Sequence, residues 1–383
     1  MSAPRARRDT PAPLLGGRSP RAFLARHWQR KALLVRAAVP GFAGMLGRKE
    51  LFALAGRDDV ESRLVLREGA RYTLEHGPFR AADFRALPAR QWTLLVQGVN
   101  LHDDAADALL REFSFIPYAR LDDVMVSYAT PGGGVGPHFD SYDVFLLQGM
   151  GRRRWRYGPQ RDLSLRPRLP VKILRAFTPT HDEVLEGGDM LYLPPSHAHD
   201  GIALDECTTY SIGFRAAANV ELAQAFLDHL RDRLAIDGRY ADPGLLPASE
   251  PARVTSDLVR HAVRTLAGIT WDRRMVERFL GAMLSEPKAD VYFDAPEAPL
   301  SARAFAAAIG RQGVRLDRRT QWLYDDDAMY VNGECRAWPR ADRAAYAALA
   351  NARALPAAQA RKLAAATQAA LYADYRHGYL HPA

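Results

Sequence analysis

The sequence is poor in lysine and cysteine, and it has no long apolar run. Nowhere in the 383 residues does a stretch approach the roughly 18 apolar residues that a membrane-spanning helix needs. The basic N-terminus lacks the apolar core of a secretory signal, although its arginine-rich, acid-poor composition resembles a transit peptide. The two cysteines, Cys207 and Cys335, lie far apart, which argues against a disulfide framework or a zinc knuckle. These absences predict a reducing compartment, and we expect the protein in the cytoplasm.

The positive charge is concentrated at the N-terminus. The chain has a formal net charge of +8, and residues 1–40 alone hold nine Lys and Arg against one Asp. The rest of the chain is therefore neutral overall, which does not favour a body built to bind nucleic acid. Residues 1–19 are rich in Pro, Gly and Arg, and we predict a disordered basic arm there. Weak RNA contact through this arm or through the C-terminal domain is the most that the charge supports.

From residue 20 to residue 216 the pattern is typical of a β-sandwich or barrel. Short apolar runs alternate with Gly- and Pro-containing turns, and a helix is expected to begin at Pro20. A second helix is expected within residues 104–113. The clearest strands are expected over residues 92–99, 122–130, 188–195 and 208–215.

Two further regions follow, each with its own composition. In residues 217–286, apolar side chains repeat every four residues, which predicts helices with one apolar face; the first set is Leu222, Phe226, Leu230 and Leu234. Such faces suit a dimerisation region, and packing against the chain's own β domain explains them equally well. Residues 287–383 read as a helix, a β-hairpin and further helices, which is compatible with a winged-helix shape.

Three pairs combine a histidine with an acid two residues later. They are His102/Asp104, His138/Asp140 and His181/Glu183. The first lies at an exposed helix start and the third in a polar loop. Only His138 and Asp140 stand at the start of an apolar strand, where residues two apart share one face. This spacing predicts that one imidazole and one carboxylate converge on a metal ion.

A third ligand is expected from the segment LYLPPSHAHDG, in which a strand ends at Pro-Pro and is followed by His197 and His199. Two histidines and one carboxylate leave three positions open on an octahedral ion, the arrangement of non-haem Fe(II) oxygenases. Zinc is more often closed by a fourth ligand or holds a water for hydrolysis. The alternative for His138 is an ordinary histidine of the core.

The arginines that follow the metal-site pair suggest an anion site. If GMG (149–151) is a hairpin turn, alternation places Arg153 with Trp155 and Tyr157 on the inner face of the next strand. A buried guanidinium requires an anion, and its two parallel donors match a carboxylate. Metal and anion sites together suit a chelating dicarboxylate such as 2-oxoglutarate. The alternative is that Arg153 pairs with a buried carboxylate of the protein.

At this point a resemblance is evident. PGGGVGPHFDSYDVFLLQGMGRRRWRYG (131–158), GDMLYLPPSHAHDG (188–201) and YSIGFRAA (210–217) resemble the bacterial ribosomal oxygenases, which are JmjC-type enzymes using Fe(II), 2-oxoglutarate and O2. The resemblance implies a double-stranded β-helix of the cupin type, a helical dimerisation region and a C-terminal winged helix. It implies His138, Asp140 and His199 as iron ligands and Arg153 as the 2-oxoglutarate anchor. It also implies hydroxylation of the β-carbon of an arginine in large-subunit ribosomal protein L-sixteen.

Four more residues are candidates for contacts in such a site. Tyr142 and Asp143 are predicted to contact the substrate, although an ion pair between Asp143 and one of the arginines explains that carboxylate equally well. Ser127 and Ser211 are predicted to contact the cosubstrate, unless they bond only to backbone. The alternative functions are a histidyl hydroxylase of another ribosomal protein, and a nucleic-acid-binding protein whose cupin domain senses a ligand.

Overall fold

The structure, a computed structural model, describes residues 9–69, 71–339 and 341–383, so residues 1–8 of the predicted arm lie outside it. The chain divides into two compact units. The first unit is formed by residues 1–216, 288–320 and 353–383, and the second by residues 217–287 and 321–352. The chain therefore passes from one unit to the other four times, and the C-terminal region contributes to both. The limits 20–216, 217–286 and 287–383 stay our prediction for the domains.

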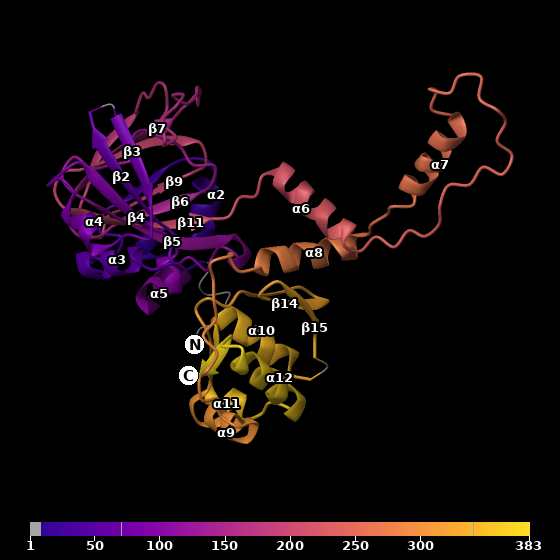
Figure 1. The fold of residues 1–383 in the computed structure, drawn as a ribbon. Coiled ribbons are helices and arrows are strands. Elements are labelled where there is room, and N and C mark those ends of the chain that lie inside the picture. Colours follow the sequence, from indigo (N-terminus) through magenta and orange to yellow (C-terminus); the bar gives the residue numbers. More distant parts are fainter. Residues whose placement is uncertain (1–8, 70, 340) are drawn as a thin grey trace. The chain divides into compact units, whose positions relative to one another are not determined.

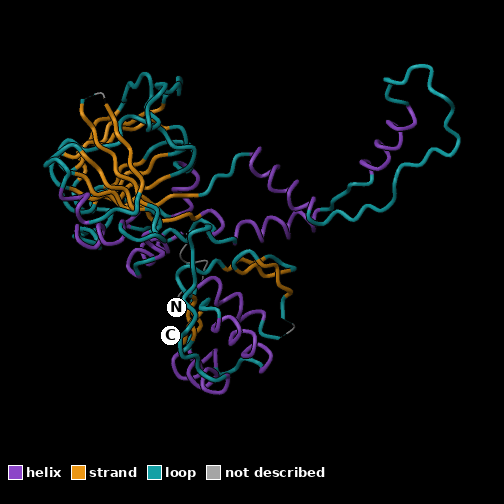
Figure 2. Tube along the Cα trace, viewed as in Figure 1, coloured by secondary structure: helices purple, strands orange, loops and turns teal. Residues whose placement is uncertain are grey.

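The first unit is built on two facing β-sheets (Figures 1 and 2). The larger has eight strands in the order β1-β9-β6-β11-β5-β4-β2-β3, and the smaller has the order β10-β7-β8. Apolar side chains of both sheets meet in one cluster, among them Leu146 and Leu191 from the larger sheet and Trp155 and Tyr157 from the smaller. The strands are β1 (Leu33–Val35), β2 (Ser62–Glu68), β3 (Arg71–His76), β4 (Trp92–Val96), β5 (Leu121–Ala129), β6 (Val144–Gln148), β7 (Arg153–Pro159), β8 (His181–Leu185), β9 (Met190–Leu193), β10 (His197–Ala203) and β11 (Cys207–Phe214).

Helices cover the outer face of the larger sheet. Phe23 and Leu51 from two of these helices are completely buried in one core with Phe145 and Tyr210 of the sheet. Strands β6 and β9 are therefore buried on both faces, which explains their nearly continuous apolar sequences. The helices are η1 (Pro13–Leu15), α2 (Pro20–Arg26), α3 (Arg48–Ala55), α4 (Ala81–Arg85), η2 (Val99–Leu101), α5 (Asp104–Glu112) and η3 (Tyr118–Arg120).

Two predictions about this unit are wrong. The predicted arm is ordered in its second half, because Leu15 of η1 is completely buried in the core and Ala12 bridges Arg18. The GMG turn is not a hairpin, because β6 and β7 belong to different sheets. The backbone N–H of Gly149 donates to Thr208 O at 2.8 Å, so the turn is held by β11 while the chain crosses between sheets.

The C-terminal part of the first unit consists of a small antiparallel sheet and three helices. Its three strands have the order β16-β12-β17, and Phe305 of its first helix is completely buried beside Tyr375. The elements are α9 (Ala302–Gln312), β12 (Val314–Leu316), β16 (Ala354–Leu355), α11 (Ala357–Ala360), α12 (Ala365–Arg376) and β17 (Leu380–Pro382).

The second unit consists of helices and one three-stranded sheet. Phe226 contacts Phe279 with ring centroids 5.2 Å apart, while Leu234, predicted on the same face, lies beyond the end of its helix. The elements are α6 (Asn219–Arg231), α7 (Ser256–Ala267), α8 (Arg273–Ser285), β13 (Trp322–Tyr324), β14 (Ala328–Val331), β15 (Glu334–Ala337) and α10 (Arg343–Ala352). In the part of the chain that the structure describes, no helix combines the length and apolar character required to cross a bilayer.

Candidate metal centre

The segment that carries His138 and Asp140 precedes β6 and is not itself a strand. The prediction that a strand aligns the two side chains is therefore wrong. Instead, His138 forms an isolated antiparallel bridge with His199 on β10, with backbone hydrogen bonds of 2.9 and 2.8 Å. Two residues later, the carbonyl of Asp140 accepts from the N–H of Ser196 at 2.8 Å. The ligand-bearing segment is thus fixed by pairing with β10.

Glycines allow this close approach. A Cβ on Gly134 would lie 2.4 Å from Gly201 O, and a Cβ on Gly136 would lie 2.4 Å from Ile173 Cδ1. Gly136 also has a φ of +82°, a conformation that other residues rarely adopt. The PGGGVGP sequence is therefore needed for the segment to pass between β10 and its other neighbours.

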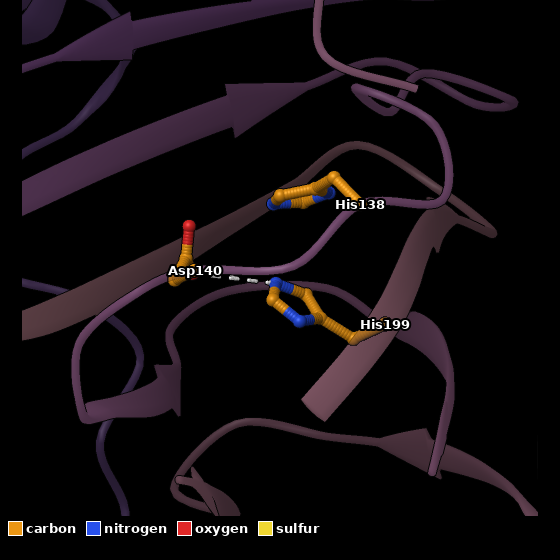
Figure 3. Close-up of side chains that lie close together, drawn as sticks. All are labelled: His138, Asp140 and His199. Carbon is orange, nitrogen blue, oxygen red and sulfur yellow. Dashed lines mark ion pairs between the residues drawn. The ribbon is translucent and has the colours of Figure 1, made fainter. Parts of the chain in front are cut away.

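The side chains of His138, Asp140 and His199 converge (Figure 3). One donor atom of each lies within 4.8 Å of the others, and His199 Nε2 is 3.6 Å from Asp140 Oδ2. The Nδ1 atoms contact the carbonyls of Gly136 at 2.9 Å and His197 at 3.0 Å. A carbonyl only accepts, so each Nδ1 carries the proton and each Nε2 keeps its lone pair for an ion.

The surroundings of His199 favour a neutral imidazole. Burial, together with the neighbouring His138, lowers the pKa of His199 to about 4, although Asp140 opposes this shift. A neutral histidine is the form that binds a metal. The ring of His197 is not in this cluster, and its contribution is the carbonyl that orients His199. Two histidines and one carboxylate fit a divalent ion with open positions.

Arg153 lies on the inner face of β7, as alternation predicts. It is only 4% exposed, together with Trp155 and Tyr157, whereas Arg154 points outward to Asp182. Its Nη1 donates to Ser127 Oγ at 3.0 Å, while Nε and Nη2 are buried and have no hydrogen-bond partner. No carboxylate among the described residues forms an ion pair with it, so the buried-pair alternative is not supported. Two free, buried, cationic donors fit a bound carboxylate.

Trp155 was not predicted as a site residue, yet it lies between the two halves of the site. Its ring centroid is 5.8 Å from that of His199, and the guanidinium carbon of Arg153 lies 5.7 Å from it. Its indole N–H is buried without a partner. The two-residue spacing from Arg153 on a strand was the signal that could have identified it.

The remaining candidates separate into different surroundings. Ser127 is buried beside Arg153 and its hydroxyl also lies 3.4 Å from Thr209 O. Ser211 is buried on the same face of the larger sheet, opposite Leu146 and Met125. Tyr142 is 40% exposed, and burial of part of its ring together with Asp140 raises the pKa of its phenol.

Asp143 is not available to a substrate. It is completely buried, and its carboxylate accepts from the Tyr192 hydroxyl at 2.6 Å and from Gln29 Nε2 at 3.0 Å. Arg120 lies 3.8 Å away, which agrees with the alternative of an ion pair with an arginine. The prediction of a substrate contact fails because the side chain points into the helix-covered core.

The other two His-x-acid pairs do not join a metal cluster among the described residues. His102 follows η2, where burial lowers its pKa, and Asp103 caps α5 by accepting from Ala106 N. His181 is the first residue of β8 and not part of a loop as predicted; its ring stacks on Tyr157 at 4.8 Å.

Known proteins resemble both parts of this architecture. Residues 108–222 match the family model "JmjC domain", and residues 268–381 match "ROXA-like winged helix". The ribosomal protein uL16 3-hydroxylase of Escherichia coli (strain K12) is 36% identical over 318 residues, which span 82% of this chain and 84% of that protein. The X-ray structure of E. coli ycfD superposes with a TM-score of 0.81 at 34% identity, covering 94% of this chain and 96% of that one. A structure of YcfD, a ribosomal oxygenase from E. coli, in complex with cobalt and 2-oxoglutarate gives a TM-score of 0.77 at 33% identity, with the same coverage.

Proposed function

The chain belongs to the JmjC-type ribosomal oxygenases, and from this premise we propose that it hydroxylates the β-carbon of an arginine in ribosomal protein uL16. The reaction uses Fe(II), 2-oxoglutarate and O2. The observation that carries the proposal is the pairing of a His138–Asp140–His199 donor set with a buried arginine that has two free donors. The similar E. coli protein is named a uL16 3-hydroxylase, and position 3 of an amino acid is its β-carbon.

We assign the metal to His138, Asp140 and His199. Fe(II) bound there would supply, with 2-oxoglutarate and O2, the chemistry that puts one oxygen atom into a C–H bond and the other into the succinate that remains when 2-oxoglutarate loses CO2. These three residues would hold the ion and leave coordination positions open for the cosubstrate and O2. The carbonyls of Gly136 and His197 keep both imidazoles in the tautomer that offers Nε2.

Arg153 holds the far carboxylate of 2-oxoglutarate through Nε and Nη2. Ser127 accepts from Nη1, so its role is to orient the guanidinium, and Ser211 stays a predicted contact of the cosubstrate. Trp155 closes the space between Arg153 and His199 and excludes water from it. These residues position the cosubstrate: its 2-oxo acid end is the one able to chelate the metal, and its far carboxylate is left for Arg153.

Tyr142 is our candidate for contact with the reacting side chain. It is two residues from Asp140 and remains 40% exposed, and an aromatic face binds a guanidinium favourably. The residues that hold the metal and the cosubstrate determine the reaction but not its target. The same centre would therefore also serve a histidyl hydroxylase. Mass spectrometry of ribosomal proteins from the host, with and without this gene, separates the two.

In that experiment we expect an arginine-containing peptide of uL16 to lose 16 Da, the mass of one oxygen atom, in the deletion strain. The same loss on a histidine of another protein keeps the chemistry and overturns the substrate. An unchanged set of ribosomal proteins contradicts the proposed function. Because its substrate is assembled into ribosomes, we place the protein in the cytoplasm, and the basic arm and C-terminal domain stay predicted sites of RNA contact.

We also propose that the helical region forms a homodimer. No residue of α7 is buried, and its exposed apolar side chains include Val259 (49%), Val263 (60%) and Leu266 (63%). A helix with such a face requires a covering partner. We expect Val263→Glu with Leu266→Glu to convert a dimer into a monomer in light scattering. A wild-type monomer at micromolar concentration contradicts the proposal.

A further inference from the structure

The connection between β7 and β8 is long and basic. It runs over residues 160–180, whereas connections between strands usually have only a few residues. It contains four arginines and one lysine but a single acid, Asp162. Long ordered connections of this kind are usually functional. Figure 1 shows it at the same end of the sheets as the β2–β3 hairpin.

This loop is firmly attached beside the metal centre. It folds back on itself through hydrogen bonds from Arg166 N to Ile173 O and from Arg175 N to Ser164 O, both 2.8 Å. Ile173 is 2% exposed and packs with Val65 and Tyr72 of the hairpin. Leu174 N donates at 2.8 Å to the carbonyl of the proline that immediately precedes His138. The loop therefore forms one wall next to the ligand-bearing segment.

The charges of the loop are exposed and without partners. We call the following set the basic rim: Arg67, Arg161, Arg166, Arg168, Lys172 and Arg175. The five loop cations are all exposed, and none forms an ion pair within the described residues. Arg67, from the hairpin, lies over the ring of Tyr72 at 5.9 Å. Asp162, the one acid of the loop, accepts from the N–H of Ser164.

The arginines on β7 and just before it differ from those of the loop. Arg152, Arg154 and Arg156 are each paired, with Asp205, Asp182 and Asp200. Like charges close together repel one another at low ionic strength, and they are stabilised when an anion binds. The basic rim therefore has the charge of a site for a polyanion, and its arginine content suits phosphate, which a guanidinium binds with two donors.

We propose that the basic rim binds the phosphate backbone of RNA and so brings the metal centre to a ribosomal protein that is held on or beside RNA. This inference rests on the proposed function, because a ribosomal-protein substrate is what makes RNA the expected polyanion near the active site. A free basic protein is repelled by the basic rim, whereas the same protein with its RNA is attracted. RNA contact then lies on the catalytic unit, in addition to any contact by the N-terminal arm.

The test compares two triple variants of the full-length protein. Arg161→Glu with Arg166→Glu and Lys172→Glu reverses the rim. Arg26→Glu with Lys49→Glu and Arg85→Glu is the matched control, because these cations of α2, α3 and α4 are also exposed and free of ion pairs in the described chain. Binding to a fluorescein-labelled RNA hairpin is measured by anisotropy between 50 and 300 mM salt. Removing three phosphate contacts lowers the salt slope of log K by about 2 to 3. We expect at least a tenfold weaker Kd for the rim variant at the lowest salt and less than a threefold change for the control.

The same proteins are tested for hydroxylation of a short arginine peptide of uL16. Peptide turnover that does not fall, together with weaker RNA binding in the rim variant, supports the inference. Three results overturn it. The first is an equal loss of RNA binding in both triple variants, and the second is no RNA binding by the wild type. The third is binding only to vesicles of phosphatidylcholine and phosphatidylserine. Absence of peptide hydroxylation in the wild type contradicts the proposed function instead. A glutamine version of the rim variant replaces the glutamate version if the latter does not fold.

Discussion

Arg153→Met tests the anion site through two measurements, the stability of the ligand-free protein and its affinity for 2-oxoglutarate. Arg153 is 4% exposed and only Nη1 has a hydrogen-bond partner, so within the described part of the chain this buried cation has no counter-charge. Methionine has a similar length and no charge. Replacing an unpaired buried charge with an apolar side chain is expected to stabilise the ligand-free fold by about 1–3 kcal/mol. That corresponds to a rise in Tm of at least a few degrees.

Binding of 2-oxoglutarate changes in the opposite sense. Nε and Nη2 would donate two charge-assisted hydrogen bonds, each worth about 1.5–3 kcal/mol. Even the lower value for both bonds amounts to about 3 kcal/mol, which is roughly a hundredfold increase in Kd. We therefore expect a more stable protein that no longer binds its cosubstrate at micromolar concentration.

The assay is anaerobic calorimetric titration with 2-oxoglutarate in the presence of Mn(II), together with thermal unfolding of the ligand-free protein. Arg154→Met is the control, because Arg154 is one position away but points outward to Asp182. It should leave the Kd within a factor of three. A wild-type Kd in Arg153→Met, or a clear fall in Tm without ligand, would refute the argument, since the latter shows that Arg153 has a stabilising partner in the protein.

Four other expectations follow from the same contacts. His138→Ala should abolish the binding of Co(II), followed by its visible absorption, while circular dichroism stays unchanged; retained stoichiometric binding contradicts the ligand assignment. Gly136→Ala should lower the free energy of unfolding by more than about 1 kcal/mol in urea titration, because of the positive φ and the 2.4 Å approach to Ile173; an unchanged value is inconsistent with the close packing. Asp143→Ala should cost about 2–3 kcal/mol by leaving the Tyr192 hydroxyl and Gln29 amide without their acceptor, and a loss of activity at full stability would instead favour a substrate contact. Burial opposes ionisation of Asp317, but hydrogen bonds with His381 and Arg319 outweigh it and lower the pKa of this carboxyl. The ionised carboxyl therefore stabilises the folded protein above about pH 4, and this contribution is lost as the pH falls further. Asp317→Asn should weaken this acid dependence of the free energy of unfolding in urea titrations from pH 3 to 6.

Short-range patterns in the sequence determined much of this protein. The family follows from the motifs around His138, Arg153 and His199, and the similar proteins confirm it. The inward direction of Arg153 follows from alternation with Trp155 along one strand, because the backbone of a strand has a period of two. The helices at Pro20 and at residues 104–113 follow from apolar spacing, and they lie where predicted.

Other features depend on partners that are distant in the sequence. The hairpin expected at GMG is a crossover between sheets, since Gly149 bonds to Thr208 almost 60 residues later. Asp143 appears next to the ligands in sequence, yet its carboxylate is taken by Tyr192 and Gln29, and no local pattern reports such partners.

The alignment of the metal ligands is the clearest case. His138 and Asp140 do not share a strand face; a backbone bridge to His199 brings them together across 61 positions. The sequence by itself determined which side chains are able to bind a metal and an anion, because that depends on residue type. Only the tertiary structure decided that Arg153 has no counter-ion among the described residues and that the basic rim lies beside the metal centre. Charge pairing depends on distances between segments that fold together from far apart in the chain.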